Sequence, residues 1–449
     1  MKNVSIPVKK EYTCDVLVAG GGVAGIAAAI CSARMGANTI LVDSGGVLGG
    51  TATKGLVGPF MTSYDRKGET RIIRGFYEEL VDRLVAEGSA IHPSKCPGSD
   101  SYAGYRDKGH IGVAPFSAEA LKRVAETMCQ EAGVKLLYHA TVVACDTEDN
   151  VIRTAYIAVP TGLEAIHATT FVDTTGSSNL AYHAGAETFR GDENGLVQTS
   201  SLFFQIVDVN KAVLDEHMAK NADYTPRFFM NEIEEARQRG EFPCGTLKLR
   251  IFESMDGVWT VNMCQEDEPV NELDTEAMTQ AEINQRKQVK MIFDFLKKRI
   301  PGLENIRLTT SGSDLGVRES RRIVGEVMFT AKDVAESAYY DQRIAVCANS
   351  MDFHKAVGVE YTAYSSTSNY YIPMGSLISK NIKNLLAAGK NLSADKFAHA
   401  AVRVMPPCMA MGEAAGIAAA LAVKHGGDPR KVDVKEIQAQ ILANGGYLE

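Results

Sequence analysis

The hydrophobic pattern of the chain changes its period near the N-terminus. Residues 16–19 form a short apolar run, and residues 23–35 form an apolar, alanine-rich stretch that is long enough for a helix. A second apolar run, 39–42, follows and ends at Asp43. We therefore predict a strand–helix–strand unit between Tyr12 and Asp43.

Three glycines, Gly20, Gly22 and Gly25, stand between the first predicted strand and the helix. In this spacing the first allows a tight turn, the second allows backbone to approach a pyrophosphate, and the third allows the helix to pack on the strand. The start of the helix, with Val23 and Ala24, presents N–H groups and a positive dipole end to an anion. The unit predicts a dinucleotide-binding site.

Asp43 stands about 20 residues beyond the glycines, where a carboxylate can accept hydrogen bonds from ribose hydroxyls. An acid there favours an unphosphorylated adenosine ribose, and therefore FAD or NAD over NADP. A second glycine-rich loop follows at 44–53. A domain that binds only NAD does not need this loop, so we expect a longer cofactor. The candidate contacts in the loop are Ser44, Gly49, Gly50, Thr51 and Thr53.

With this second loop, the chain resembles the large superfamily of FAD-dependent oxidoreductases of the glutathione reductase fold type. The run 170–173, followed by Thr175 and Gly176, is similar to the second FAD-contacting strand and turn of that superfamily. Before it we predict a helix over 118–132, a strand over 134–143 that contains Val142, and a hairpin of 151–158 with 164–170. The resemblance implies that these strands form the sheet inserted between the two FAD-binding strands.

The resemblance narrows to the FAD_oxidored group of bacterial flavoproteins over 49–60, 318–334 and 384–421. It implies an α/β fold in which a Rossmann-like FAD-binding domain with a parallel sheet carries an inserted α+β substrate domain. It also implies FAD as the cofactor, with no metal site. Domains are expected at 1–189 with 366–430 for FAD, at 190–365 for substrate, and at 431–449 for a C-terminal helical tail.

The C-terminal part of the match predicts a strand over 382–388 that ends in Gly389. A small-residue helix should then open at Met411, with its N-terminus against the flavin carbonyls and with Gly412 and Ala415 near the cofactor. Such a helix stabilises the negative charge that hydride transfer leaves on the flavin N1–C2=O edge.

One residue departs from the superfamily pattern. Lys390 follows Gly389, at a place where many relatives carry an acid that binds the ribitol chain. Asn391 and Asp395 are the two alternatives for that contact.

Composition narrows the class of protein. A chain of 449 residues with 45% hydrophobic side chains can bury a large core and should hold two or more domains. A net charge of −8 disfavours nucleic acid and membrane surfaces as partners. The nine cysteines include no C-x-x-C pair, which argues against a zinc site or a dithiol relay. The polar N-terminus lacks a signal segment, so we expect a cytoplasmic protein, with a homo-oligomer left open.

Three arginines are candidates for substrate binding. Arg318, Arg321 and Arg322 would share one face of a helix at i, i+3 and i+4, and their guanidinium groups could clamp a carboxylate or carbonyl. The alternative is that Arg318 and Arg321 form ion pairs with Glu319 or Glu326 and hold the two domains together.

Two further candidates lie before the predicted flavin-facing helix. His399 and Arg403, at i and i+4, would serve as acid/base and charge stabiliser if this segment is helical. The alternative is a histidine that only makes structural hydrogen bonds. His354 is a comparable candidate.

Four tyrosines form a cluster before the last predicted strand: Tyr361, Tyr364, Tyr370 and Tyr371. They could bind a polar substrate, or some of them could lie in the core.

These patterns predict an FAD-dependent oxidoreductase that exchanges hydride with a small organic substrate, which is anionic or carbonyl-bearing. The electron donor or acceptor is not identified by the sequence. Two alternatives remain open: a flavin reductase fed by NAD(P)H, and a non-catalytic flavin component that relays electrons within a larger complex. A second complete G-x-G-x-x-G motif is absent. Covalent attachment of the flavin is also left open.

Overall fold

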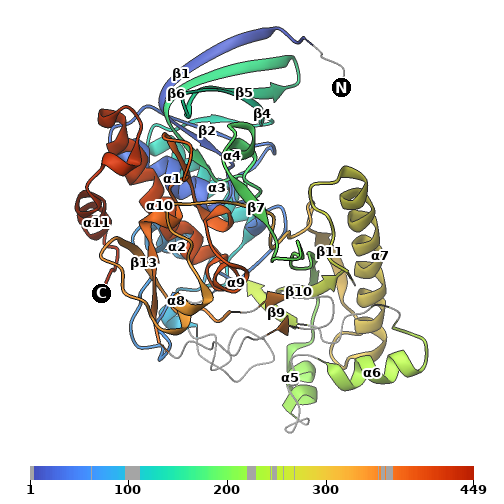
Figure 1. Cartoon of the computed structure of the whole chain (residues 1–449). Helices are drawn as coiled ribbons and strands as arrows, with labels where there is room; N and C mark the ends of the chain where they lie inside the picture. The colour runs from blue at the N-terminus through green and yellow to red at the C-terminus, as the bar shows by residue number, and fades with distance from the viewer. Residues whose placement is uncertain are drawn as a thin grey trace.

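The computed structural model describes residues 5–61, 63–96, 112–219, 229–242, 244, 250–255, 257–266, 268–351, 353–354, 359–360 and 368–449. They form an α/β fold built around a seven-stranded sheet that is rich in parallel pairs (Figure 1). A second, four-stranded sheet lies to one side of the first and carries its own helices (Figure 1).

The predicted strand–helix–strand unit is confirmed. Strand β1 (Val8–Ala19), helix α1 (Val23–Arg34) and strand β2 (Thr39–Val42) follow one another, and β1 pairs with β2 in parallel. Strand β3 (Lys135–Leu137) extends the sheet beyond β2, again in parallel. Residues 16–19 of β1 and all of β2 are buried, which accounts for their unbroken apolar runs.

Strand β6 (Gly162–Asp173) pairs with β1 along one edge and divides its other edge between two strands. Its first residues pair antiparallel with β5 (Val151–Val159), which confirms the predicted hairpin. Its last residues pair in parallel with the C-terminal strand β17 (Leu385–Ala387). The carboxyl ends of β1, β2, β6 and β17 therefore meet at one edge of the sheet, although β17 is distant in sequence.

The prediction of one strand over 134–143 is wrong. The chain turns at His139, which has a positive φ of 53°, and divides the segment into β3 and β4 (Thr141–Glu148). Strand β3 pairs with β2 at one edge of the sheet, whereas β4 pairs with β5 at the other edge. The apolar run thus serves two separate places in the sheet.

Helix α10 (Met405–Ala422) is the central helix of the fold and packs along α1 (Figure 1). Gly412 and Gly416 allow the two helices to approach closely: an added Cβ would lie 2.2 Å from the main-chain oxygen of Ala24 and of Ala28, respectively. The segment Met405–His425 is long and apolar enough to cross a membrane, but 78% of it is buried within the fold. The prediction that this helix opens at Met411 is wrong, because it begins at Met405.

The second sheet has the order β11 (Arg307–Ser311), β8 (Ser201–Val207), β10 (Val258–Gln265), β9 (Arg250–Met255). Helix α7 (Thr275–Arg299) covers it and ends just before Pro301, a residue that cannot continue a helix. Helix α6 (Met230–Gln238) lies at the lower end of α7, and helix α5 (Lys211–Ala219) lies below the second sheet (Figure 1). Together these elements enclose a hydrophobic core of their own around Trp259.

The structure contains further helices and strands. They are α2 (Phe76–Ala86), α3 (Ala118–Glu131), α4 (Asn179–His183), β7 (Thr188–Arg190), β12 (Arg321–Ile323), α8 (Ala331–Ala335), β13 (Arg343–Cys347), β14 (Phe353–His354), β15 (Val359–Glu360), β16 (Tyr370–Pro373), α9 (Lys396–Val402) and α11 (Val434–Ala443). Helices α3 and α11 lie where the sequence predicts them.

Candidate active site

A cavity of about 540 Å³ opens at the carboxyl ends of β1, β2, β6 and β17. This edge is where open α/β sheets bind their ligands, because the loops and helix starts converge there. The far wall comes from the second sheet, through Ser201 and Phe203 on β8 and Asn262 on β10. The cavity therefore lies between the two sheets.

Most of the residues predicted to bind the cofactor line this cavity. They are Gly20, Gly22, Val23, Ala24, Asp43, Ser44, Gly49, Gly50, Thr51, Val142, Thr175, Gly176 and Gly389. The structure thus brings together the two glycine-rich loops, the turn after β6 and the turn after β17. These four segments are separated by long stretches of chain, and each ends at the same edge of the sheet.

The three glycines of the first loop differ in what surrounds them. Gly20 has a φ of +103°, and a Cβ there would lie 2.5 Å from the Thr174 main-chain oxygen. A Cβ on Gly25 would lie 1.8 Å from the Gly20 main-chain oxygen. Gly22 has no atom within 4 Å of an added Cβ. Its missing side chain therefore leaves open space at the N-terminus of α1, as a bound pyrophosphate requires.

Asp43 connects the two glycine-rich loops. Its Oδ2 accepts a hydrogen bond of 2.7 Å from the Gly21 N–H, and its Oδ1 accepts one of 2.7 Å from the Gly45 N–H. The Lys54 ammonium group lies 3.4 Å from Oδ1. A carboxylate oxygen has more than one lone pair, so Asp43 can still accept from ribose hydroxyls on the cavity side.

Five predicted cofactor residues do not line the cavity: Gly25, Thr53, Met411, Gly412 and Ala415. They support the lining from behind. The Thr53 hydroxyl donates to the Leu48 main-chain oxygen at 2.7 Å and holds the second loop in its turn. Met411, Gly412 and Ala415 are mid-helix residues of α10, buried in the interior of the fold. The residues of α10 that do reach the cavity are Met405 and Cys408, with Val404 just before them.

The predicted helical clamp of three arginines is wrong. Residues 317–320 are irregular, and Arg321 and Arg322 lie in β12, which pairs with β7. Successive strand residues point to opposite faces, so the side chains separate. Of the three, only Arg318 lines the cavity.

The three guanidinium groups have different partners. Arg318 donates to the Thr199 main-chain oxygen and, at 3.0 Å, to the Ser201 hydroxyl. Arg321 donates to the Ser177 main-chain oxygen and to Asn179. Arg322 is fully buried and forms an ion pair of 2.7 Å with Glu319. A structural ion pair with Glu319 therefore exists, but Arg322 forms it, whereas the alternative interpretation expected Arg318 or Arg321.

His399 lies behind the cavity wall. It is fully buried in α9, and its Nε2 lies 3.1 Å from the main-chain oxygen of Lys390. Burial, and then the cations Arg322, Arg403 and Lys390, hold its pKa well below the usual value of 6.5. The imidazole is therefore neutral, and it carries its proton on Nε2 because a carbonyl can only accept.

Arg403 and His354 do line the cavity. Arg403 caps the C-terminus of α9, where its N–H donates to the His399 main-chain oxygen at 3.0 Å. The N–H of His354 donates to the side-chain oxygen of Gln198 at 3.2 Å. Both candidates therefore have side chains that a bound molecule can reach.

The tyrosine cluster divides. Tyr370 is a core residue whose hydroxyl donates to the main-chain oxygens of Asn349 and Ala401 at 3.0 and 3.3 Å. Tyr371 is partly buried on the same strand. Tyr361 and Tyr364 lie outside the described residues.

Sequence reasoning missed several cations of the cavity. Besides Arg318 and Arg403, the lining includes Lys54, Arg66, Arg250 and Lys390. Only Lys390 carried a signal, as a basic residue at a place where relatives carry an acid. Of the two alternatives for the ribitol contact, Asn391 is buried and donates to Asp173, and Asp395 caps the N-terminus of α9. Neither lines the cavity.

The charges along the cavity are unevenly placed. In the lining, Lys54 lies near both acidic residues, 3.4 Å from Asp43 and 3.7 Å from Asp314. Among the lining residues that the structure describes, every other charged one is a cation: Arg66, Arg250, Arg318, Lys390 and Arg403. A chain with a net charge of −8 thus has a basic cavity.

The fold and the cavity define a dinucleotide-binding α/β protein with a second ligand-facing wall. The model of the FAD dependent oxidoreductase family matches residues 15–441. The chain therefore belongs to this family of enzymes, and FAD is its cofactor. The open space beside Gly22 and the carboxylate of Asp43 fit this cofactor.

Other comparisons give proteins of lower similarity. Thiamine thiazole synthase from Aeropyrum pernix is 30% identical over 200 residues, which is 43% of this chain and 64% of that enzyme. The crystal structure of p-nitrophenol 4-monooxygenase from Pseudomonas putida is 11% identical with a TM-score of 0.47, and the match covers 97% of this chain and 85% of that one. A geranylgeranyl bacteriochlorophyll reductase-like protein from Thermoplasma acidophilum is 12% identical with a TM-score of 0.46, covering 96% and 84%.

Proposed function

We propose that this chain exchanges hydride between bound FAD and a small organic substrate that carries a carboxylate or another anionic group. The observation that carries this proposal is the basic wall of the cavity. Arg66, Arg250, Arg318, Lys390 and Arg403 face a space that continues beyond the residues assigned to the dinucleotide. Guanidinium groups bind carboxylates through charge-assisted hydrogen bonds, often two at a time.

Different residues of the cavity bind the cofactor and the substrate. The adenosine end of FAD belongs at Asp43, and the pyrophosphate belongs at Gly22 and the N-terminus of α1. The flavin supplies the hydride chemistry when FAD is bound. Arg318, Arg403 and His354 are the residues that we assign to the substrate.

Arg318 is the best-supported substrate ligand. Its guanidinium group is fixed by the Thr199 main-chain oxygen and by the hydroxyl of Ser201, the first residue of β8. A group held in this way binds a substrate without first losing rotational freedom.

We also propose that residues 190–365 act as the substrate domain, that 1–189 with 366–430 hold FAD, and that 431–449 form a C-terminal tail. The separate core around Trp259 supports this division.

The test is anaerobic reduction of the FAD-loaded protein, followed by its absorption. A panel of small carboxylates, each beside its uncharged amide, is compared with NADH and NADPH. The proposal expects reduction, or the reverse reaction from reduced flavin, with carboxylates only. Reduction by NADH or NADPH alone favours a flavin reductase. Failure of every compound, with a stable electron-transfer partner in the same preparation, favours the relay component.

Arg318→Gln provides the matched variant. It should raise the KM for the carboxylate by about 10- to 100-fold, the range expected when a charge-assisted hydrogen bond is lost. Arg286→Gln removes the same charge from the exposed face of α7 and serves as the control. Equal KM values in wild type and Arg318→Gln would contradict the assignment.

A further inference from the structure

Helix α10 opens on the cavity with few hydrogen-bond donors. Its N-cap is Val404, and its first three residues are Met405, Pro406 and Pro407. Proline has no N–H, so two of the first three backbone donors are missing. The Cys408 N–H is used within the helix, where it bonds to the Val404 main-chain oxygen. A helix start that faces a flavin normally supplies such donors, and here only Met405 remains.

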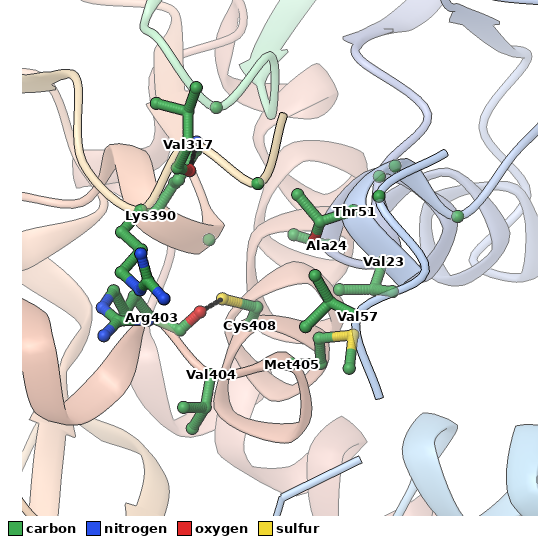
Figure 2. A pocket seen from close by; sticks show the side chains of 18 of the residues that line it. Val23, Ala24, Thr51, Val57, Val317, Lys390, Arg403, Val404, Met405 and Cys408 are labelled. Atoms are coloured by element: carbon green, nitrogen blue, oxygen red, sulfur yellow. Dashed lines mark hydrogen bonds between the residues drawn. The ribbon is translucent and has the colours of Figure 1, made fainter. Parts of the chain in front are cut away.

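Two cationic side chains, Lys390 and Arg403, line the cavity together with the start of α10. Figure 2 shows the side chains of Lys390 and Arg403 beside one another, with Val23 and Ala24 of the first glycine loop across the cavity. Lys390 follows the turn at Gly389, and its side chain runs over the turn after β6: a Cβ added to Gly176 would lie 2.7 Å from its Cε. Lys390 therefore reaches from one cofactor-lining turn to another.

Lys390 is held in place at both ends. Its ammonium group donates to the main-chain oxygen of Val317, and its own main-chain oxygen accepts from the neutral imidazole of His399. Among the residues that the structure describes, no carboxylate lies within ion-pair distance of this ammonium group. Its charge is therefore oriented by backbone contacts and is not neutralised by an adjacent acid.

We propose that Lys390 supplies the positive charge that stabilises the flavin ring of FAD when the ring becomes negatively charged, in place of the missing N–H donors of α10. This inference rests on FAD being bound in the cavity, and it adds a role that the proposed function does not assign. A fixed cation close to a developing negative charge favours its formation, since the interaction needs no reorganisation. His399 then acts as a positioning residue through the Lys390 carbonyl.

The charge on Lys390 depends on pH. Burial is the main cause that lowers its pKa to about 8; Glu272, Cys408 and Glu319 act against this shift, and Arg403 acts with it. Burial raises the pKa of the neighbouring Cys408 thiol to about 12. Lys390 is thus protonated below pH 8 and loses its charge above it, in a range where the Cys408 thiol does not titrate.

Inorganic sulfite tests the proposal without any substrate. It adds reversibly to oxidised flavin and bleaches the visible band, and the product ring is negatively charged, so its dissociation constant reports positive charge near the ring. Lys390→Met should weaken sulfite binding about tenfold or more, as loss of a charge a few ångström away implies. Lys390→Arg should restore most of the affinity. Lys383→Met, which removes an exposed lysine seven residues earlier, should bind sulfite like the wild type.

The wild-type protein gives an independent measurement. Its affinity for sulfite should fall as the pH rises through about 8, and this fall should be absent from Lys390→Arg. Unchanged sulfite affinity in Lys390→Met, or a flat wild-type pH profile, would overturn the proposal. Loss of FAD from Lys390→Met, together with a wild-type sulfite affinity that does not change with pH, would also overturn it. Lys390 would then act by binding the phosphates of the cofactor. Bound FAD that responds to sulfite but accepts hydride from no carboxylate would instead contradict the proposed function alone.

Discussion

Gly25 packs directly on the main chain of Gly20, since a Cβ added to Gly25 would lie 1.8 Å from the Gly20 oxygen. Gly22, three residues before it, would carry a Cβ with no neighbour within 4 Å. The two glycines thus serve different ends. Gly25 is required by the fold, and Gly22 keeps open the space in which the cofactor lies.

This difference predicts a separation of stability from cofactor affinity. Gly22→Ala should fold, with a loss in free energy of unfolding of less than about 1 kcal/mol, because alanine is only a poorer N-cap than glycine. Its FAD dissociation constant should rise at least about tenfold, because the methyl group occupies the space of the pyrophosphate. Gly25→Ala should unfold or lose most of its stability. Urea unfolding and FAD fluorescence titration measure the two effects, and a Gly22→Ala protein with wild-type FAD affinity would rule out this placement.

His399 should make the protein less stable in mild acid. Its pKa is held well below 6.5 in the fold and returns to about 6.5 on unfolding, so the unfolded state binds a proton that the folded state excludes. The stability that this group contributes is present above pH 6.5 and is lost as the pH falls below it, by up to about 1.4 kcal/mol per pH unit.

The matched variant is His399→Gln, which can still donate to the Lys390 carbonyl but does not titrate. Urea unfolding between pH 5 and 7.5 should show a shallower loss of stability for the variant than for the wild type. Burial raises the pKa of Glu413 to about 6, which acts with the opposite sign but is common to both proteins. Identical slopes would mean that His399 is not the group responsible.

The Arg322–Glu319 pair should be structural. Both side chains are fully buried, and Arg322 also donates to the Gly191 main-chain oxygen. Arg322→Met leaves an unpaired carboxylate in the interior and should lower the free energy of unfolding by about 3–5 kcal/mol. Chemical denaturation measures this, with the exposed Arg307→Met as control. An Arg322→Met protein that has normal stability but binds carboxylates poorly would instead show that Arg322 belongs to the active site.

Local patterns were enough to predict the parts of the fold that depend on local chemistry. The strand–helix–strand unit, the helix over 118–132 and the 151–158 hairpin follow from the period of apolar residues and from their bounding turns. The role of Gly25 follows from its spacing. In each case the information lies within a short segment of chain.

The sequence was less informative where structure depends on distant partners. The segment at Arg321 is a strand because residues 188–190 pair with it, and no local signal shows this. The burial of His399 depends on its packing against Lys390. Helix α10 begins at Met405 because proline is tolerated in the first turn of a helix, although it breaks the interior. The five residues of the basic wall are far apart in the sequence, and the wall is visible only in the fold.

The most direct test of the central claim is an anaerobic titration of the FAD-loaded protein with small carboxylates, followed by the flavin absorption spectrum. The account predicts that the chain binds FAD, that an anionic compound changes the redox state or the spectrum of the flavin, and that Arg318→Gln weakens this response while Arg286→Gln does not. A protein that holds no flavin after reconstitution, or whose flavin responds equally to carboxylates and to their uncharged amides, would contradict it.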